Sequence, residues 1–341
     1  MPLGRRDRGM VLIVVLFFVL LLGSTIATFQ SRALIDHMVV ANRDARARAE
    51  ALARGGVELA KAVLLEDIYQ QRQTELALDH REELWARVSG VPIVFEDDAT
   101  LEVAIEDVAS KLNLNAVLAF DESGNPEERS LALVEALLGK VIREMPEASG
   151  GDRYDPAELA AHLIDYVDED TTSLRGDPED DAYQRRDPPT RPANRPLLSV
   201  DELRRVEGFD GDLVASLRPY VTVYPFVGGG GINPNTAPPW VLALLFFDDE
   251  VELRLADEDT VRRLLLAREE GGWVCGEEQS AEGCTPIREI VTNAIFPEPD
   301  YSSDVFVITA TGRVGDVVRR IEAVLDRGDG SAPQLLSWRA L

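Results

Sequence analysis

The sequence contains few of the residues that build metal centres and disulfide frameworks. Its 341 residues include two cysteines and three histidines, too few for a four-cysteine zinc site or a cysteine-stabilised miniprotein. Basic residues are also scarce: 35 Lys and Arg stand against 61 Asp and Glu, for a formal net charge of −26. A general nucleic-acid binder needs a basic face, so the composition argues against that class. The hydrophobic content of 45% is typical of a globular chain of two or three domains.

Charge is absent from a long segment near the N-terminus. No charged residue occurs from Met10 to Phe29, and the segment follows the basic stretch MPLGRRDRG. At ~1.5 Å per residue a helix of this length spans ~30 Å, the thickness of a bilayer core. We therefore expect a membrane-spanning helix with its basic flank in the cytoplasm and the rest of the chain outside. No small-residue cleavage site of the signal-peptide type follows it, and a plain signal anchor is one interpretation.

The apolar pattern continues beyond the membrane segment and predicts one helix from about Met10 into the sixties. Apolar and small residues recur at steps of three, four or seven, which is the spacing of one helix face. They are Ile35, Met38, Ala45, Ala49, Leu52, Gly56, Leu59 and Val63. The stripe formed by Ala45, Ala49, Leu52 and Gly56 suits close packing, and we expect it to contact the helix of another subunit. Packing against the protein's own sheet is the alternative.

The remainder of the chain predicts an α+β fold. Residues 91–107 alternate between apolar and polar side chains, as do 305–315 and 317–326, and these patterns predict half-buried strands. The last two meet at Gly315-Asp316, a natural hairpin turn, and residues 335–338 could add an edge strand. Residues 131–300 are mainly helical in pattern. A long N-terminal helix on a small antiparallel sheet, interrupted by a large helical insertion, is the simplest interpretation.

Two parts of this insertion look like repeated helix-hairpin-helix units. In residues 199–221 Ser199 and Glu202 have the spacing of a capping box at the start of a helix, and a turn from Gly208 to Gly211 separates that expected helix from a second one. A second unit could run from 232 to 295, beginning with a helix capped near Asn235. Related hairpins in DNA-binding proteins hold phosphate with backbone amides and cations. Acidic residues flank the first hairpin here and would repel phosphate, so we expect a packing or partner surface. They are Glu207, Asp210 and Asp212.

An acidic stretch between Asp165 and Asp187 is the most chemically suggestive feature. Nine carboxylates occur there against three arginines, and such crowding is unfavourable inside an ordered domain unless a cation neutralises it. Calcium takes six to eight oxygen ligands, although the spacing is not that of an EF-hand. A solvated acidic loop is the alternative, and a catalytic dyad would need a cleft. The candidate ligands are Asp165, Asp168, Asp170, Glu179, Asp180 and Asp181.

Cys275 and Cys284 enclose a short polar loop. Outside the cytoplasm thiols tend to oxidise, so we expect a disulfide, with two free thiols as the alternative. Closing a loop of this size would stabilise the protein by roughly 2–3 kcal/mol. The four glycines at 228–231 lack the Lys-Ser/Thr of a phosphate-binding loop and suggest a flexible joint. No common hydrolase, metalloprotease or dinucleotide-binding motif is present.

The N-terminal pattern resembles a type IV prepilin leader: a short basic peptide, then Gly9, then the helix retained in the mature protein. This resemblance implies cleavage between Gly9 and Met10 by a prepilin peptidase and methylation of Met10. The fifth mature residue is usually Glu, and here it is Val14. Loss of that carboxylate is characteristic of the general secretion pathway protein K family, the type II secretion minor pseudopilins that the chain resembles. Further matching phrases are SKLNLN (110–115), LIDYVDEDTTSLRGDPEDDAY (163–183), DPPTRPANRPLLSVDELRRVEGFD (187–210), LRPYVTVYP (217–225) and INPNTAPPWVL (232–242).

The resemblance implies a pilin-like fold with an inserted helical domain that binds calcium. It implies a non-enzymatic subunit at the tip of a short pilus-like fibre, with minor pseudopilins I and J as partners. A single pass through the bacterial inner membrane would place the main domain in the periplasm, where it would support protein export. The expected divisions are a leader (1–9), a transmembrane part (10–30), the remaining helix with the first strands (31–112), a helical domain with the calcium loop (113–225), a second helical unit (226–300) and C-terminal strands (301–341).

Two other functional classes are open alternatives. A DNA-binding minor pilin of a DNA-uptake machine would use the hairpin units, and a signal-anchored periplasmic hydrolase would use the acidic residues. The acidic hairpins argue against nucleic acid as a partner. The absence of an activated nucleophile motif argues against the hydrolase.

Overall fold

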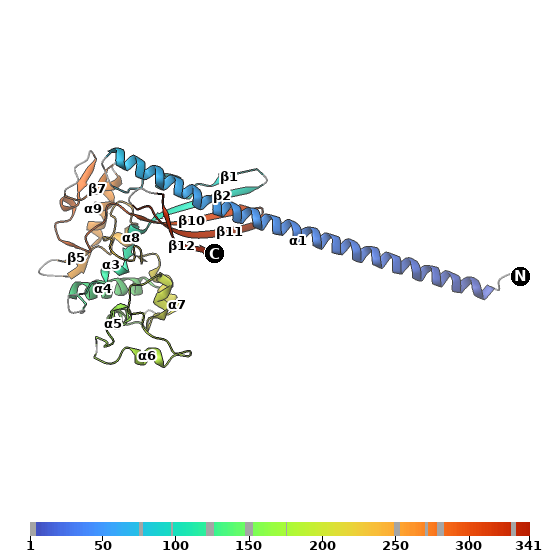
Figure 1. The fold of residues 1–341 in the computed structure, drawn as a ribbon, viewed down its shortest axis with the longest axis horizontal. Coiled ribbons are helices and arrows are strands. Elements are labelled where there is room, and N and C mark those ends of the chain that lie inside the picture. Colours follow the sequence, from blue (N-terminus) through green and yellow to red (C-terminus); the bar gives the residue numbers. More distant parts are fainter. Residues whose placement is uncertain are drawn as a thin grey trace.

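The computed structural model describes residues 5–74, 78–96, 98–120, 126–146, 153–174, 176–248, 253–269, 272–277, 283–328 and 332–341. Its most prominent element is α1 (Arg5–Thr74), a single helix of 70 residues and ~105 Å. The helix projects far beyond the rest of the molecule (Figure 1). It contains an apolar stretch long enough to cross a membrane. It begins before Met10 and so includes part of the expected leader, whose residues 1–4 lie outside the described residues.

The C-terminal half of α1 packs on a five-stranded sheet, in the strand order β1-β2-β10-β11-β12, with every neighbouring pair antiparallel (Figure 1). The strands are β1 (Ile93–Val94), β2 (Ala99–Asp107), β10 (Val305–Val314), β11 (Val317–Asp326) and β12 (Gln334–Ala340). β10 and β11 form the hairpin expected at Gly315-Asp316. Gly315 has φ +54°, a left-handed conformation that glycine adopts without strain. A short helix, α2 (Leu84–Val88), connects α1 to the sheet.

The interface between α1 and the sheet is an apolar core. The alternating residues of the strands face one stripe of the helix, because side chains repeat every second residue in a strand and every 3.6 in a helix. This core includes Ala53, Val57, Ala60 and Leu64 of α1 together with Leu101, Val103, Ile105, Phe306, Ile308 and Ile321 of the sheet.

The small-residue stripe of α1 lies on this inner face. Ala49 has no exposed surface, and Ala45 and Leu52 pack around the same contact. A Cβ atom added to Gly56 would lie 2.8 Å from Cδ1 of Leu101, closer than carbon atoms approach. The expectation that another subunit's helix contacts this stripe is therefore wrong. Small residues are needed because the chain's own sheet approaches the helix closely.

Residues 108–304, called the insert below, leave the sheet after β2 and return at β10. β2 and β10 are neighbours, and Asp107 pairs with Phe306. The insert lies at the end of the sheet farthest from the N-terminus of α1 (Figure 1). Its helices are α3 (Leu114–Val117), α4 (Glu128–Glu144), α5 (Pro156–Val167), α6 (Asp180–Gln184), α7 (Gly211–Leu217), α8 (Pro239–Leu242), α9 (Glu258–Glu269) and α10 (Ile287–Ile290), with 3-10 turns at η1 (Val108–Ser110) and η4 (Val200–Arg205).

The insert also contains short strands, in contrast to its mainly helical sequence pattern. They are β3 (Leu112–Asn113), β4 (Val221–Thr222), β5 (Phe246–Asp248), β6 (Leu253–Leu255), β7 (Trp273–Cys275), β8 (Cys284–Pro286) and β9 (Ile295–Phe296). The second helix-hairpin-helix unit is not confirmed: α9 and α10 are helices as expected, but the first helix is shorter than expected. Helix α8 ends at Leu242, and β5 pairs with β6 and β9 in a small sheet. The first unit keeps only the order of a 3-10 turn η4, a glycine turn and the short α7.

Candidate functional site

The acidic stretch forms a compact group of three carboxylates in the insert. Asp165 lies in the last turn of α5, Asp168 caps that helix, and Glu179 directly precedes α6. The intervening loop turns back on itself, because Thr172 and Pro178 form a bridge and Gly176 adopts φ +88°. One carboxylate oxygen from each of Asp165, Asp168 and Glu179 lies within 4.8 Å of the others. All three side chains are buried.

This carboxylate group is incompletely satisfied. Oδ1 of Asp168 and both carboxylate oxygens of Glu179 are buried without a hydrogen-bond partner. Burial, together with the charges of Asp170 and Asp165, raises the pKa of Asp168 to about 7. Burial and the charge of Asp168 raise the pKa of Glu179 to about 8. Buried polar atoms are normally paired, so unpaired oxygens converging on one point fit a bound hard cation such as Ca²⁺.

The other three candidate ligands lie outside this group. Asp170 is exposed, and its Oδ1 accepts a hydrogen bond from the backbone N of Thr172 at 2.6 Å. Asp180 is half-buried and Asp181 is exposed. The structure therefore brings together three of the six residues. The fold of the loop explains the difference. Asp168 and Glu179 meet across the loop, whereas the side chain of Asp170 is exposed to solvent.

The cysteine pair is joined in the structure. Cys275 and Cys284 form a disulfide with their Cα atoms 5.9 Å apart, at the parallel pair β7 and β8. Neighbouring Trp273 stacks on His80, with ring centroids 4.8 Å apart. The disulfide joins β7 to β8 within the insert, and the stacked rings join β7 to the segment that follows α1. The proposed processing residues Gly9 and Met10 lie within the continuous helix α1, and Met10 is exposed.

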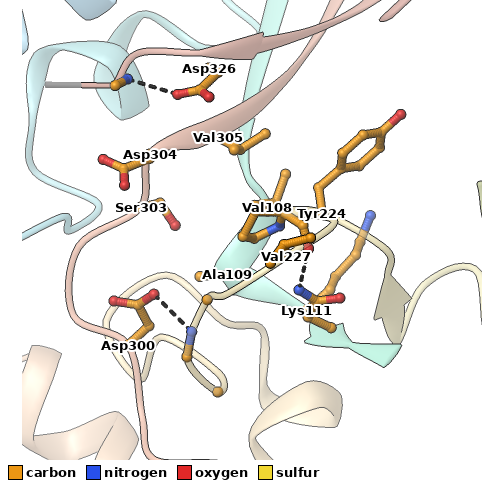
Figure 2. Close-up of a pocket in the computed structure, with 16 residues that line it drawn as sticks. Val108, Ala109, Lys111, Tyr224, Val227, Asp300, Ser303, Asp304, Val305 and Asp326 are labelled. Atoms are coloured by element: carbon orange, nitrogen blue, oxygen red, sulfur yellow. Dashed lines mark hydrogen bonds between the residues drawn. The ribbon is translucent and has the colours of Figure 1, made fainter. Parts of the chain in front are cut away.

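Three of the four glycines, Gly229, Gly230 and Gly231, line part of a 420 Å³ cavity between the insert and the sheet (Figure 2). The backbone N of Gly230 donates to Oδ2 of Asp300 at 3.4 Å, and Asp304 and Asp326 also line the cavity. A Cβ on Gly231 would lie 2.5 Å from the carbonyl oxygen of Pro297. The segment therefore packs closely against residues 297–300, which contradicts the expected flexible joint. The acidic lining disfavours phosphate.

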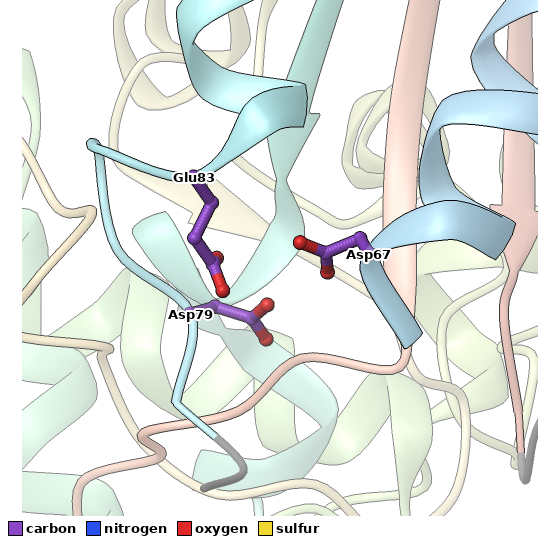
Figure 3. A group of neighbouring side chains, drawn as sticks. All are labelled: Asp67, Asp79 and Glu83. Carbon is purple, nitrogen blue, oxygen red and sulfur yellow. The ribbon is translucent and has the colours of Figure 1, made fainter. Parts of the chain in front are cut away.

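A second carboxylate group was missed from the sequence. Asp67 of α1 and Asp79 and Glu83 of the following segment lie close together (Figure 3), with carboxylate oxygens within 4.8 Å of one another. Arg327, beyond β11, pairs with both aspartates. These residues follow no motif spacing, since Asp67 and Arg327 are 260 positions apart. Only the fold brings them together.

Comparison with known proteins gives consistent matches. The family model "Type II secretion system (T2SS), protein K" matches residues 110–226. A type II secretion system protein K from Aeromonas hydrophila is 29% identical over 335 residues, covering 96% of this chain and 95% of that protein. The protein of the same name from Klebsiella pneumoniae is 28% identical over 272 residues, covering 80% of this chain and 78% of that protein.

A solved structure shares the fold. A chain in the crystal structure of the GspK-GspI-GspJ complex from the type 2 secretion system of enterotoxigenic Escherichia coli superposes with a TM-score of 0.62. The match covers 89% of this chain and 99% of that chain at 18% sequence identity. The family model, the relatives and the solved structure all agree with the resemblance seen in the sequence. The comparisons therefore confirm the resemblance of this chain to the type II secretion system protein K family, the minor pseudopilins.

Proposed function

We propose that this minor pseudopilin caps the tip of the type II secretion pseudopilus and supports protein export across the outer membrane. The observation that carries the proposal is the position of the insert, a large domain at the end of the sheet remote from the membrane segment (Figure 1). A pilus-like fibre grows by adding subunits beneath those already present. A domain of this size would collide with the subunit above it anywhere except at the tip.

The N-terminal part of α1 provides the contact with the membrane and with other subunits. Residues 10–29 would cross the inner membrane, and the sheet and insert would lie in the periplasm. Beyond this segment the helix still carries exposed apolar side chains: Leu34, Met38 and Val40 are 66%, 67% and 65% exposed. Apolar side chains exposed together mark an interaction surface. By analogy with the GspK-GspI-GspJ complex, we assign this surface to the helices of minor pseudopilins I and J.

Calcium would hold the acidic loop of the insert in its folded form. Asp165, Asp168 and Glu179 are the proposed ligands, since their buried oxygens converge and those of Asp168 and Glu179 lack partners. Bound Ca²⁺ supplies positive charge and takes further oxygens from water or backbone. The role is structural, and the residues give no reason to propose an enzymatic activity or a nucleic-acid partner.

Co-purification tests the assignment of the exposed apolar helix. Full-length protein carrying Met38→Arg should recover much less of minor pseudopilins I and J than the parent. Its melting temperature should be unchanged, because Met38 makes no contact with the core. Met38→Leu is the matched control, since it keeps an apolar side chain of similar size and should recover both partners normally. Equal recovery with Arg and Leu would contradict the assignment.

A further inference from the structure

The connection between the insert and the rest of the molecule is built around three buried carboxylates, Asp67, Asp79 and Asp107, and a half-buried one, Glu83. Asp67 comes from α1, and Asp79 and Glu83 come from the segment after it (Figure 3). Asp107 is the last residue of β2. Arg327 follows β11. We call this group the junction cluster. It has no bearing on the tip position or on calcium, and it therefore stands independently of the proposed function.

The junction cluster has too little positive charge for its carboxylates. Arg327 is 3% exposed, and its Nη1 and Nη2 lie 2.6 and 2.7 Å from Oδ2 of Asp67 and Oδ2 of Asp79. One guanidinium thus serves two aspartates. Glu83 is a third carboxylate in the same space (Figure 3), and no cation of the described residues forms an ion pair with it. Even partial burial of such a charge is unfavourable.

The hydrogen bonds show the same imbalance. Nε2 of Gln71 lies near Oδ2 of Asp67 (3.3 Å), Oδ1 of Asp79 (3.0 Å), Oε1 of Glu83 (3.2 Å) and the carbonyl oxygen of Leu78 (3.4 Å). An amide NH₂ has two protons, so four oxygens compete for them. Oε2 of Glu83 is already occupied by two donors. A proton on Oε1 of Glu83 removes the conflict, because the protonated carboxyl becomes a donor.

The junction cluster also holds the insert. The carbonyl oxygen of Asp79 accepts from Nδ2 of Asn233 at 3.2 Å, and the same Nδ2 donates to Oδ2 of Asp107 at 3.1 Å. Thr236 donates to Asp107 as well. Asn233 and Thr236 belong to the insert, so the position of Asp79 and Asp107 fixes that of the segment 233–236. A change at the carboxylates is therefore transmitted to the attachment of the insert.

A metal ion explains the cluster less well than a proton does. In the acidic loop, oxygens of Asp168 and Glu179 are left without partners. Among the described residues, no carboxylate oxygen of the junction cluster is buried and unpartnered in this way. Arg327 already occupies the position between Asp67 and Asp79 where a cation would bind.

We propose that Glu83 holds a proton in the closed junction, and that loss of this proton loosens the attachment of the insert to the sheet and α1. The junction would then act as a proton-sensitive joint. The surrounding charged and titratable groups are Asp67, Asp79, His80, Arg81, Glu82, Asp107, Arg268, Asp300, Asp304, Asp326 and Arg327. Arg81 and Arg268 donate to backbone carbonyl oxygens at 234–237 and not to the carboxylates.

The electrostatics give the direction of the pH dependence. Burial, with the charges of Asp79 and Asp67, raises the pKa of Glu83 to about 8. Burial and the charge of Asp79 raise the pKa of Asp107 to about 6, while burial lowers the pKa of His80, which keeps its ring neutral. A raised carboxyl pKa stabilises the closed state at low pH, and this stabilisation is lost as the pH rises through the folded pKa. The junction should therefore open above about pH 8.

Amide hydrogen exchange of full-length protein in detergent, with saturating calcium, tests the proposal. After correction for the intrinsic pH dependence of exchange, protection of segments 78–85 and 232–237 should fall about tenfold per pH unit above pH 8, the slope for one proton. Protection of the β10-β11 hairpin serves as an internal reference and should not fall. Glu83→Gln, which is neutral at every pH, should keep the junction protected at pH 9. Glu82→Gln, at an exposed neighbour, is the matched control and should behave as the parent.

Infrared spectroscopy of the unmodified chain keeps the test independent of how well a variant folds. The measurement is made with saturating calcium, so that Asp168 and Glu179 of the acidic loop do not contribute. A protonated-carboxyl band should be present at pH 6.5 and lost by pH 9. Its absence at pH 6.5 would overturn the proposal. So would protection of the junction that stays constant from pH 7 to pH 9, or an equal fall in the parent and in Glu83→Gln.

Discussion

Gly312 of β10 lies directly against the backbone of Ala49 in α1. A Cβ atom on Gly312 would overlap the carbonyl oxygen of Ala49 and lie 2.9 Å from the backbone N of Ala53. Neither obstacle is a flexible side chain, so the helix or the strand would have to move. This contact sets how closely α1 approaches the sheet.

We expect Gly312→Val to lower the free energy of unfolding by about 1–3 kcal/mol, the usual range for overpacking a core. Urea unfolding of the detergent-solubilised chain measures the change. Arg313→Val is the matched control at the next position, where the side chain is exposed, and it should alter stability little. Similar midpoints for both variants would show that the helix can move away from the sheet at low cost.

Gly55 and Gly56 provide a second matched pair within α1. A Cβ on Gly56 would lie 2.8 Å from Cδ1 of Leu101 and 2.9 Å from Cβ of Ala310, whereas a Cβ on Gly55 would meet nothing within 4 Å. Gly55→Ala should stabilise the protein by about 0.5–1 kcal/mol, because alanine favours helix. Gly56→Ala should destabilise it. Thermal unfolding distinguishes them, and a stabilising Gly56→Ala would contradict the packing described here.

Calcium should stabilise the insert through Asp165, Asp168 and Glu179. A ligand that binds only the folded state adds ~2.7 kcal/mol at a hundred times its Kd. The melting temperature should therefore rise with calcium and fall with chelator, and Asp168→Asn should abolish the difference. Asp181→Asn, an exposed acidic neighbour outside the group, should retain it. Mg²⁺ should substitute poorly, because it demands a tighter octahedral shell. Identical melting with calcium and chelator would leave a solvated acidic loop.

Without calcium, the same loop should respond to pH. The pKa of Asp168 is raised to about 7 and that of Glu179 to about 8. Folded-state values above the unfolded ones stabilise the fold at low pH, and this contribution is lost as the pH rises through 7 to 8. The chelated Glu83→Gln variant, whose junction cannot titrate at Glu83, should therefore melt at a higher temperature at pH 6 than at pH 9. Adding Asp168→Asn should reduce this pH response.

Processing is testable by mass spectrometry of the purified protein. A chain cleaved after Gly9 would begin at Met10 and carry a methyl group on its N-terminus. Gly9→Val should retain the leader, because the resemblance to prepilins implies that a prepilin peptidase recognises glycine at this position. Gly23→Val, in the same apolar helix and with nothing within 4 Å of an added Cβ, should be processed normally. Shortening of Gly9→Val at the same site would contradict the prepilin interpretation.

The sequence predicts the elements whose pattern is local. The alternation in 305–314 and 317–326 and the turn between them gave the β10-β11 hairpin, and the continuous apolar face gave α1. The short apolar run before Asp248 was expected in the first helix of the second unit, and it forms strand β5 instead. Four to eight apolar residues fit a buried strand or a buried helix equally well, and tertiary pairing with β6 and β9 decided for the strand.

The acidic loop was predictable in part, since Asp165, Asp168 and Glu179 share one dense run of charge. Which of its members point inward depends on the turn of the loop. The junction cluster could not be predicted from sequence patterns. Asp67 and Arg327 are separated by 260 positions, and no sequence motif links single charged residues so far apart. The sequence also did not determine what the small-residue stripe of α1 packs against. Close contact with a helix and close contact with a sheet both require small side chains.

The pairing of Asp107 with Phe306 means that the insert departs from and returns to adjacent strands. For the sheet, the whole insert is equivalent to an enlarged hairpin loop between β2 and β10. The entropy of closing such a loop grows only logarithmically, by about 0.6 kcal/mol for each doubling of length. A scaffold with this connection can exchange one domain for another, or for a short turn, without rearranging its strands.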